Sequence, residues 1–199
     1  MSGAVTIPAS FDLAQTLDCG QAFRWREIVR EPGCCLWEGA AFGRVLRLRQ
    51  TEDAILFTCP EEDFQSVWRG YFDLDEDYAQ KRAELSRLSP VLAEASAFAP
   101  GIRILRQEPW EALCSFIISQ NNNIPRIKGI LDRFCRLLGD PIPGTDFFSF
   151  PTPEALAPLS VEDLAPLRAG FRAKYLLDAA RKVTSGEVDL IKTARSPVE

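Results

Sequence analysis

Three consecutive asparagines, Asn121–Asn123, lie between two apolar helical patterns, with Gln120 before them and the cations Arg126 and Lys128 after them. Amide side chains donate and accept hydrogen bonds, and cations favour a polar or anionic contact. One asparagine is explained as the N-cap of the helix that follows, and its neighbours as a turn. Because a single cap leaves at least two amides without a structural role, we expect this turn to bind something polar.

The composition removes several catalytic classes. The 199 residues contain no histidine, so they hold no Ser-His-Asp triad, no Cys-His pair and no H-E-x-x-H zinc motif. The six cysteines show no C-x-x-C spacing, and we expect buried, reduced thiols. We therefore expect neither a metal site nor a cofactor. A catalytic base in this chain would have to be a carboxylate or a lysine.

Charge is distributed unevenly along the chain. The net charge is −5, but residues 52–84 hold ten acids and three cations, a balance of −7, which leaves +2 for the remainder. A solvated acidic helix face explains the acids themselves. An anionic partner can still meet the remaining surface, because local potential rather than total charge steers binding. The net charge therefore does not exclude a nucleic acid.

Hydrophobic periodicity indicates the elements that hold these residues. Between residues 23 and 60, apolar and polar side chains alternate with period two and are interrupted by turn residues, which predicts an antiparallel meander. An extended segment near 4–13 is expected at one edge, and the meander strands are expected at 23–30, 34–41, 44–50 and 54–59. A helix at 64–71 and two at 75–88 and 90–98 follow, and the last two are expected to cover one face of the sheet.

The pattern is helical from Glu108 onward. Apolar residues recur at helical spacing behind Pro109 and again after the asparagines, which therefore occupy the tight turn of a helical hairpin. The last amphipathic helix, at 171–183, has nothing after it to cover its apolar face, which suggests a fragment. The expected fold class is α+β, with a small antiparallel β-sheet domain and covering helices at 1–103 and the first part of an all-α region at 104–199.

Four motifs are spread over nearly all of the chain: Leu17–Arg26, Leu105–Pro109, Phe116–Ile127 and Gly170–Tyr175. Together they resemble the 8-oxoguanine DNA glycosylase family of the helix-hairpin-helix superfamily. Their order, and the unusual Asn-Asn-Asn-Ile-x-Arg run, make the match far more specific than a lone short motif. The resemblance implies an incomplete helix-hairpin-helix glycosylase fold, and an enzyme that flips a damaged base out of duplex DNA.

The resemblance implies roles for five residues. Asn121 enters the space that the flipped base vacates, and Arg126 and Arg172 donate hydrogen bonds to the orphaned cytosine, whose acceptor edge suits planar guanidinium groups. Phe171 is the aromatic wedge at the distorted base step; many relatives carry tyrosine here, so only the wedge role carries over. Gly20 supplies a main-chain carbonyl that accepts the N7 hydrogen of oxidised guanine.

Local alternatives exist for three of these residues. A surface ion pair would explain Arg126, a solvent-facing helix start would explain Arg172, and a simple turn into a strand would explain Gly20. The residues that follow Gly20, from Gln21 to Trp25, are expected to support the strand rather than to contact the lesion.

The catalytic unit of the family is a Gly-Val-Gly-type hairpin, a lysine that attacks the sugar C1′ and a downstream aspartate. None of the five lysines follows such a hairpin, so we predict no catalytic residue here and a chain truncated before that unit. The resemblance thus implies the recognition portion of a base-excision-repair DNA glycosylase and AP lyase that removes 8-oxoguanine opposite cytosine. Alternatives are a non-catalytic damaged-DNA-binding module, a protein-interaction domain, or a related glycosylase with another lesion preference.

The expected partner is double-stranded DNA containing oxidised guanine, bound by a monomer. No apolar run approaches the roughly 20 residues of a membrane span, and the first residues lack the pattern of a secretion signal. We therefore expect no membrane contact and a place inside the cell with DNA, in the bacterial cytoplasm or nucleoid or in a eukaryotic nucleus.

Overall fold

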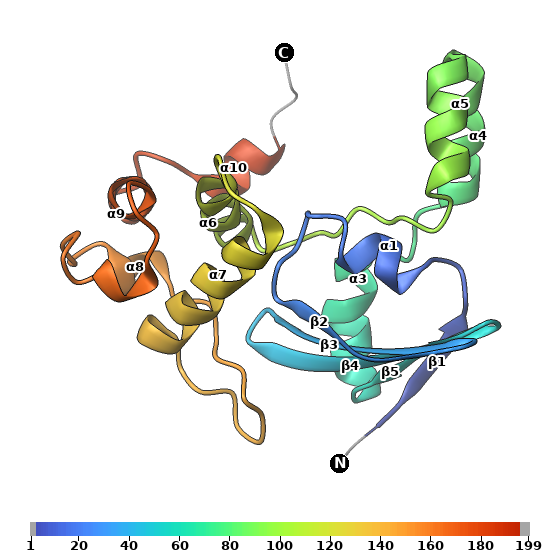
Figure 1. The fold of residues 1–199 in the computed structure, drawn as a ribbon, viewed down its shortest axis with the longest axis horizontal. Helices are drawn as coiled ribbons and strands as arrows, with labels where there is room; N and C mark the ends of the chain where they lie inside the picture. The colour runs from blue at the N-terminus through green and yellow to red at the C-terminus, as the bar shows by residue number, and fades with distance from the viewer. Residues whose placement is uncertain (1–2, 196–199) are drawn as a thin grey trace. The chain divides into compact units, whose positions relative to one another are not determined.

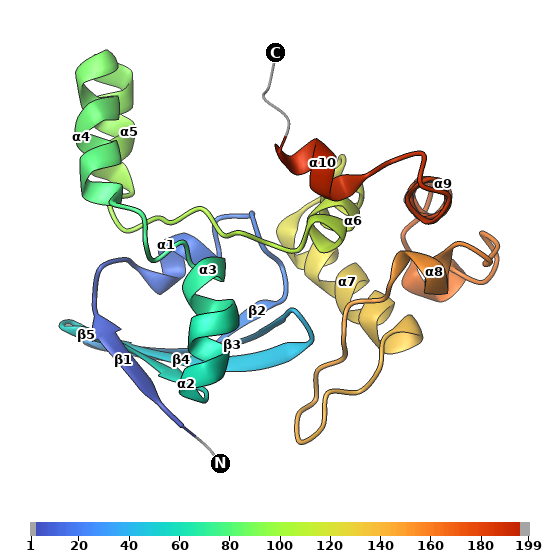
Figure 2. The ribbon, with the colours of Figure 1, turned by 180° about the vertical axis from the view of Figure 1, so that it is seen from behind.

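A computed structural model describes residues 3–195 of the chain. It divides into two compact units. The first holds the described residues up to Gly39 together with Leu46–Arg106, and the second holds Ala40–Val45 and the described residues from Gln107 onward. Figures 1 and 2 show the ribbon from opposite sides. An antiparallel sheet occupies the first part of the chain and helices dominate the rest, so the predicted α+β class is confirmed.

A five-stranded antiparallel sheet with the order β1-β5-β4-β3-β2 carries the first unit. The alternating pattern predicts four of its strands to within two residues at either end. The strands are β1 (Val5–Pro8), β2 (Trp25–Glu31), β3 (Cys34–Ala41), β4 (Arg44–Thr51) and β5 (Ala54–Thr58). The expected edge segment is β1, in which Ile7 lies opposite Ile55 of β5. The rest of that segment leads into a short helix, α1 (Leu13–Leu17).

The helical stretch after β5 packs on the sheet through aromatic side chains. It consists of α2 (Glu61–Asp63), the π-helical turn η1 (Phe64–Trp68) and α3 (Arg69–Tyr71). The Trp25 indole lies 6.2 Å from the ring of Trp68, between centroids, and donates a 2.9 Å hydrogen bond to the Tyr71 hydroxyl. Phe57 packs edge-on against Phe64, with the ring centroids 5.1 Å apart. These buried rings are among the largest side chains in the core of the first unit.

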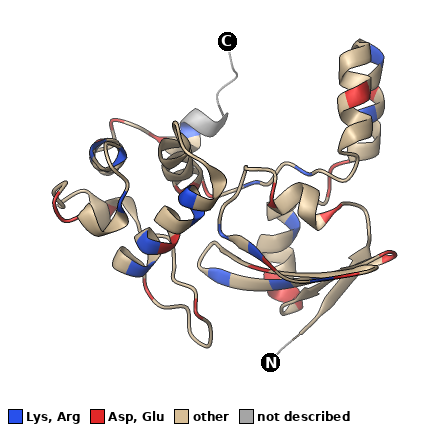
Figure 3. Cartoon of the chain, viewed as in Figure 1, with Lys and Arg blue, Asp and Glu red and all other residues tan. Residues whose placement is uncertain are grey.

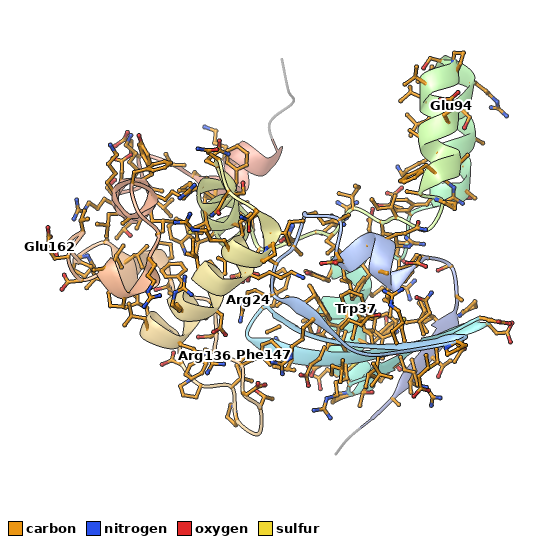
Figure 4. The ribbon with its side chains drawn as sticks, viewed as in Figure 1. Arg24, Trp37, Glu94, Arg136, Phe147 and Glu162 are labelled. Carbon is orange, nitrogen blue, oxygen red and sulfur yellow. The ribbon has the colours of Figure 1, made fainter. Side chains whose placement is uncertain are left out.

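The next two helices, α4 (Tyr78–Leu88) and α5 (Pro90–Phe98), pack against each other as a hairpin. The expectation that they cover the sheet is wrong, because neither helix has a buried residue. Asp77 and Ser89 cap the two helices by accepting backbone amide hydrogens, so local signals define the hairpin. Figure 4 shows Glu94 on α5, far along the hairpin. Helical spacing identifies an apolar face but does not say which surface it meets.

Gly39 lies in β3 directly opposite Trp25 in β2. A Cβ atom at Gly39 would overlap the Trp25 indole and the carbonyl oxygen of Arg24. We expect Gly39→Ala to lower the free energy of unfolding by about 1–3 kcal/mol, because an overpacked core forces its neighbours out of their preferred positions. Urea-induced unfolding followed by tryptophan fluorescence measures this loss.

Gly70→Ala is the matched control for this change. Gly70 lies in α3, and a Cβ atom there meets nothing within 4 Å. Alanine favours a helix over glycine, so the free energy of unfolding should stay level or rise. An equal loss in the two variants would contradict the packing argument.

Helices build the second unit, and the predicted hairpin around the asparagines is present. They are α6 (Pro109–Ser119), α7 (Ile124–Leu138), α8 (Pro153–Leu156), the 3-10 turn η2 (Ala165–Leu167), α9 (Arg172–Thr184) and α10 (Leu190–Arg195). Ile118 of α6, Phe134 of α7 and Leu176 of α9 are fully buried in its core. The Trp110 indole donates a 2.8 Å hydrogen bond to the Pro151 carbonyl, which ties α6 to the loop that precedes α8.

Candidate nucleic-acid interface

The turn between α6 and α7 is held together by its own amide side chains. Asn123 caps α7, where its Oδ1 accepts the backbone N–H of Arg126 at 3.1 Å. Asn122 donates from Nδ2 to the Ile118 carbonyl at 3.0 Å, and its Oδ1 accepts the N–H of Asn123. Gln120 donates to a carbonyl within α6. Sequence reasoning allowed one structural asparagine, but two of the three have structural roles.

Asn121 is the remaining amide of the turn. Its side chain is exposed, and it makes no hydrogen bond to any other part of the chain that the structure describes. Its backbone has φ +47°, a left-handed conformation that asparagine tolerates better than most residues. The amide is therefore presented to solvent by a turn whose other amides are engaged.

Arg172, the first residue of α9, is 3% exposed and belongs to the same cluster. Its Nε donates to the Gln120 carbonyl at 2.9 Å, and its Nη2 donates to the carbonyls of Gln120 and Asn121, the latter at 2.9 Å. Its Nη1 donates to the Ala169 carbonyl at 3.2 Å. The structure thus brings Arg172 and Asn121 together through the main chain. In this arrangement the guanidinium faces the turn, and a contact with a base would require these bonds to be exchanged.

Phe171 is an exposed aromatic residue beside this cluster, with 54% of its surface accessible. Its ring packs edge-on against Tyr175 one helical turn later, with centroids 6.2 Å apart, and the Arg172 guanidinium lies 4.5 Å from its centroid. Tyr175 was not among the predicted site residues, although its position four residues after Phe171 places it on the same helix face. An exposed pair of rings is suited to stacking on bases.

Arg126 lies in the first turn of α7 and is exposed. No ion pair or hydrogen bond involves its guanidinium within the described residues, so the surface ion pair considered from sequence is absent there. The helix carries four cations and one acid, and Figure 3 shows its blue bands. Helix α7 therefore presents a positive charge that suits a phosphate backbone.

Gly20 belongs to the first unit and follows helix α1. Its φ of +89° lies in the region that glycine adopts most easily, and it is exposed. Gln21, next to it, donates to the carbonyls of Thr16 and Arg103 and accepts the N–H of Leu105. The side chain of Gln21 therefore supports the local framework and holds the glycine-containing turn in place.

A largely apolar hollow of about 540 Å³ lies between α6 and α9. Leu113, Phe116 and Gln120 line it from α6 and the turn, and Phe171, just before α9, and Tyr175 of α9 line it from the other side. Sequence reasoning did not predict this hollow, because its lining residues come from two segments about fifty positions apart. The only sequence signal is that each segment carries apolar residues at helical spacing.

Two family models match the chain. Residues 4–113 match the 8-oxoguanine DNA glycosylase N-terminal domain, and residues 114–198 match the HhH-GPD superfamily of base excision DNA repair proteins. The chain belongs to the 8-oxoguanine DNA glycosylase family. The resemblance inferred from the four motifs is thereby confirmed.

Relatives of this 8-oxoguanine DNA glycosylase family member include an N-glycosylase/DNA lyase of Saccharomyces cerevisiae, 33% identical across 89% of this chain and 50% of the yeast protein. A second relative is MBOgg1, whose structure was solved with a low-affinity DNA ligand. Its sequence is 43% identical to this chain and its TM-score is 0.88, and the match covers 98% of this chain and 67% of the MBOgg1 chain. A third is the 8-oxoguanine glycosylase/lyase of Clostridium acetobutylicum, whose crystal structure holds double-stranded DNA containing cytosine opposite 8-oxoG. It is 38% identical with a TM-score of 0.84, and the match covers 96% of this chain and 68% of the Clostridium chain. The chain spans about half the length of the yeast relative.

The cysteines of this glycosylase-family chain are all free. Burial raises the pKa of Cys59 to about 11, with Asp63 and Glu61 adding to the effect, and burial also raises the pKa of the Cys114 thiol. Thiols of this kind stay protonated at neutral pH, so these two do not supply a nucleophile. In the described part of the chain, no group of three His, Cys, Asp or Glu side chains could hold a metal. No described helix has the length and apolar character needed to cross a bilayer.

Proposed function

We propose that these 199 residues are the damage-recognition portion of a base-excision-repair DNA glycosylase and AP lyase that removes 8-oxoguanine opposite cytosine from duplex DNA. The observation that carries the proposal is the state of Asn121, whose amide is exposed and unengaged among the described residues. Both neighbouring asparagines instead bond the turn itself. To fill the gap left by a flipped base, a protein needs a polar side chain that points outward from a fixed turn, and Asn121 is such a side chain.

The neighbouring residues supply the other parts of this recognition. Phe171, exposed and supported by Tyr175, acts as the wedge at the opened base step. Arg126 lies beyond the turn with an uncommitted guanidinium in the described structure, and it donates to the acceptor edge of the orphaned cytosine. Arg172 is the second cytosine donor once its carbonyl partners are exchanged for the base.

Gly20 distinguishes the oxidised base from guanine. 8-Oxoguanine carries a hydrogen on N7, which can donate a hydrogen bond to a main-chain carbonyl. Guanine has a lone pair on N7 instead, so the same carbonyl would face another acceptor and would bind guanine less well. The exposed, left-handed Gly20 backbone allows close approach to a base. The protein works as a monomer, inside the cell with its DNA.

The proposal assigns no catalytic residue to this chain. A glycosylase with lyase activity needs an amine that displaces the base and forms a Schiff base with the sugar. None of the five lysines follows a glycine hairpin of the family type. These residues therefore recognise damage, and the bond-breaking step is not theirs.

A binding and trapping experiment tests the proposal. Fluorescence anisotropy with the 199-residue chain should give tighter binding to a duplex with 8-oxoguanine opposite cytosine than to the same duplex with guanine, and the affinity should fall with salt. Borohydride added to the lesion complex should trap no covalent adduct. Equal affinity for the two duplexes would contradict damage recognition, and a trapped adduct would contradict the absence of catalytic chemistry.

A further inference from the structure

Arg172 makes an unusual set of contacts for a residue at the start of a surface helix. Each of its three side-chain nitrogens donates to a main-chain carbonyl, and those carbonyls belong to Gln120, Asn121 and Ala169. A guanidinium with five fixed donors is well suited to holding several carbonyls at once, and Arg172 is almost fully buried while it does so. The side chain joins the start of α9 to the turn that ends α6.

The turn needs such a contact. The last carbonyls of a helix lack intrahelical partners, and a cation near a helix C-terminus interacts favourably with the dipole. Gln120 is the C-cap of α6, and its carbonyl accepts from Arg172. The next residue, Asn121, has φ +47°, a left-handed conformation that L-residues other than asparagine seldom adopt. Arg172 thus binds the two carbonyls that flank the strained residue.

We infer that Arg172 is a positioning residue for Asn121, which fixes the left-handed turn so that the Asn121 amide is already aimed outward before DNA arrives. The inference rests on the proposed function, because it assigns Asn121 the task of filling the gap in the duplex. It also orders the events. The free protein uses Arg172 to shape the turn, and the guanidinium becomes available to cytosine only by releasing the carbonyls of Gln120 and Asn121.

Amide hydrogen exchange in the free chain tests the positioning role. Arg172→Ala should speed exchange at residues 120–124 by about tenfold or more, because the turn opens locally without its clamp. Arg172→Lys keeps the charge but lacks the fork, so it should not restore the protection. Unchanged exchange at the turn in Arg172→Ala would overturn the inference.

Arg181→Ala is the matched control. Arg181 also lies on α9 and also donates to two loop carbonyls, those of Ala157 at 3.1 Å and Leu159 at 2.8 Å. Its removal should speed exchange near those two residues and leave the amide turn protected. Faster exchange at the turn in this variant would mean that any weakening of α9 loosens it, which would also overturn the inference.

A double-mutant cycle separates positioning from direct base reading. Affinity is measured for a duplex with a tetrahydrofuran abasic analogue placed opposite each of the four bases. Opposite adenine, guanine and thymine, which lack the proposed cytosine contact, Arg172→Ala should weaken binding about tenfold, and this effect should nearly vanish in an Asn121→Gly background. A loss confined to cytosine, or losses opposite the other three bases that add in the double variant, would overturn the inference. Wild-type binding without any preference for damage would refute the proposed function, while the exchange measurement would still decide the positioning role.

Discussion

Asn121→Gly should lower the preference of the chain for a duplex with an abasic analogue opposite cytosine, over intact duplex, by about tenfold or more. The reason is that, in the proposed function, the exposed Asn121 amide fills the emptied position and bonds the orphaned base. Glycine adopts the φ of +47° without strain, so the turn keeps its shape. The free energy of unfolding should therefore change by less than about 0.5 kcal/mol. Anisotropy titrations on the two duplexes measure the preference.

Asn123→Ala is the matched control, since it deletes the same amide two positions along. Asn123 caps α7 through the N–H of Arg126, so its loss should lower the free energy of unfolding by about 1 kcal/mol. The preference for the damaged duplex should stay close to that of the wild type below the melting transition. If Asn123→Ala lowered the preference for the damaged duplex and Asn121→Gly lowered the stability, the roles assigned to the two asparagines would be wrong.

Trp68→Ala should give the largest loss of stability, about 3–5 kcal/mol in the free energy of unfolding. Trp68 has no exposed surface and contacts both Trp25 and Tyr71, at centroid distances of 6.2 and 5.8 Å. It lies in the π-helical turn η1, and its truncation leaves a cavity of indole size among its neighbours. Because a domain is stable by only about 5–15 kcal/mol, this loss should be visible as a large drop in the urea midpoint.

Phe98→Ala provides the comparison for an aromatic residue outside the core. Phe98 ends α5 and is 90% exposed, so its truncation should change the free energy of unfolding by no more than about 0.5 kcal/mol. Circular dichroism follows both variants, because it does not depend on the tryptophan that is removed. A loss at Phe98 as large as that at Trp68 would contradict the division between core and surface given above.

The sheet could be predicted from sequence because its signal is local. Trp25 faces the core while Arg26 beside it faces outward, and Leu46 and Leu48 alternate with arginines in the same way. The resulting period of two fixes which side chains face inward. The π-helical turn at Phe64–Trp68 could not be predicted, because its wider backbone winding leaves the apolar residues at nearly the same spacing as an α-helix.

In the candidate site, too, features set by local sequence could be predicted and features set by the tertiary fold could not. The position of the amide run in a helical turn follows from apolar spacing on either side, and the cap at Asn123 follows from residue type. The bonds from Asn122 to Ile118 and from Arg172 to the Asn121 carbonyl do not follow, because they depend on how the chain folds back. Residue types alone therefore could not identify Asn121 as the single unengaged amide.

The α4–α5 hairpin is the part of the first unit that we expect to open first. Neither of its helices buries a residue; besides their mutual contact and their caps at Asp77 and Ser89, the hairpin is held at its base, where the Tyr78 hydroxyl accepts the N–H of Ile104. Segments of this kind open by themselves without unfolding the core, and a protease acts on the fraction that is open at any moment. Cleavage at Lys81 or Arg87 would then precede any attack on the sheet. We therefore expect the resistance of the chain to proteolysis to depend on the stability of this hairpin rather than on the aromatic core.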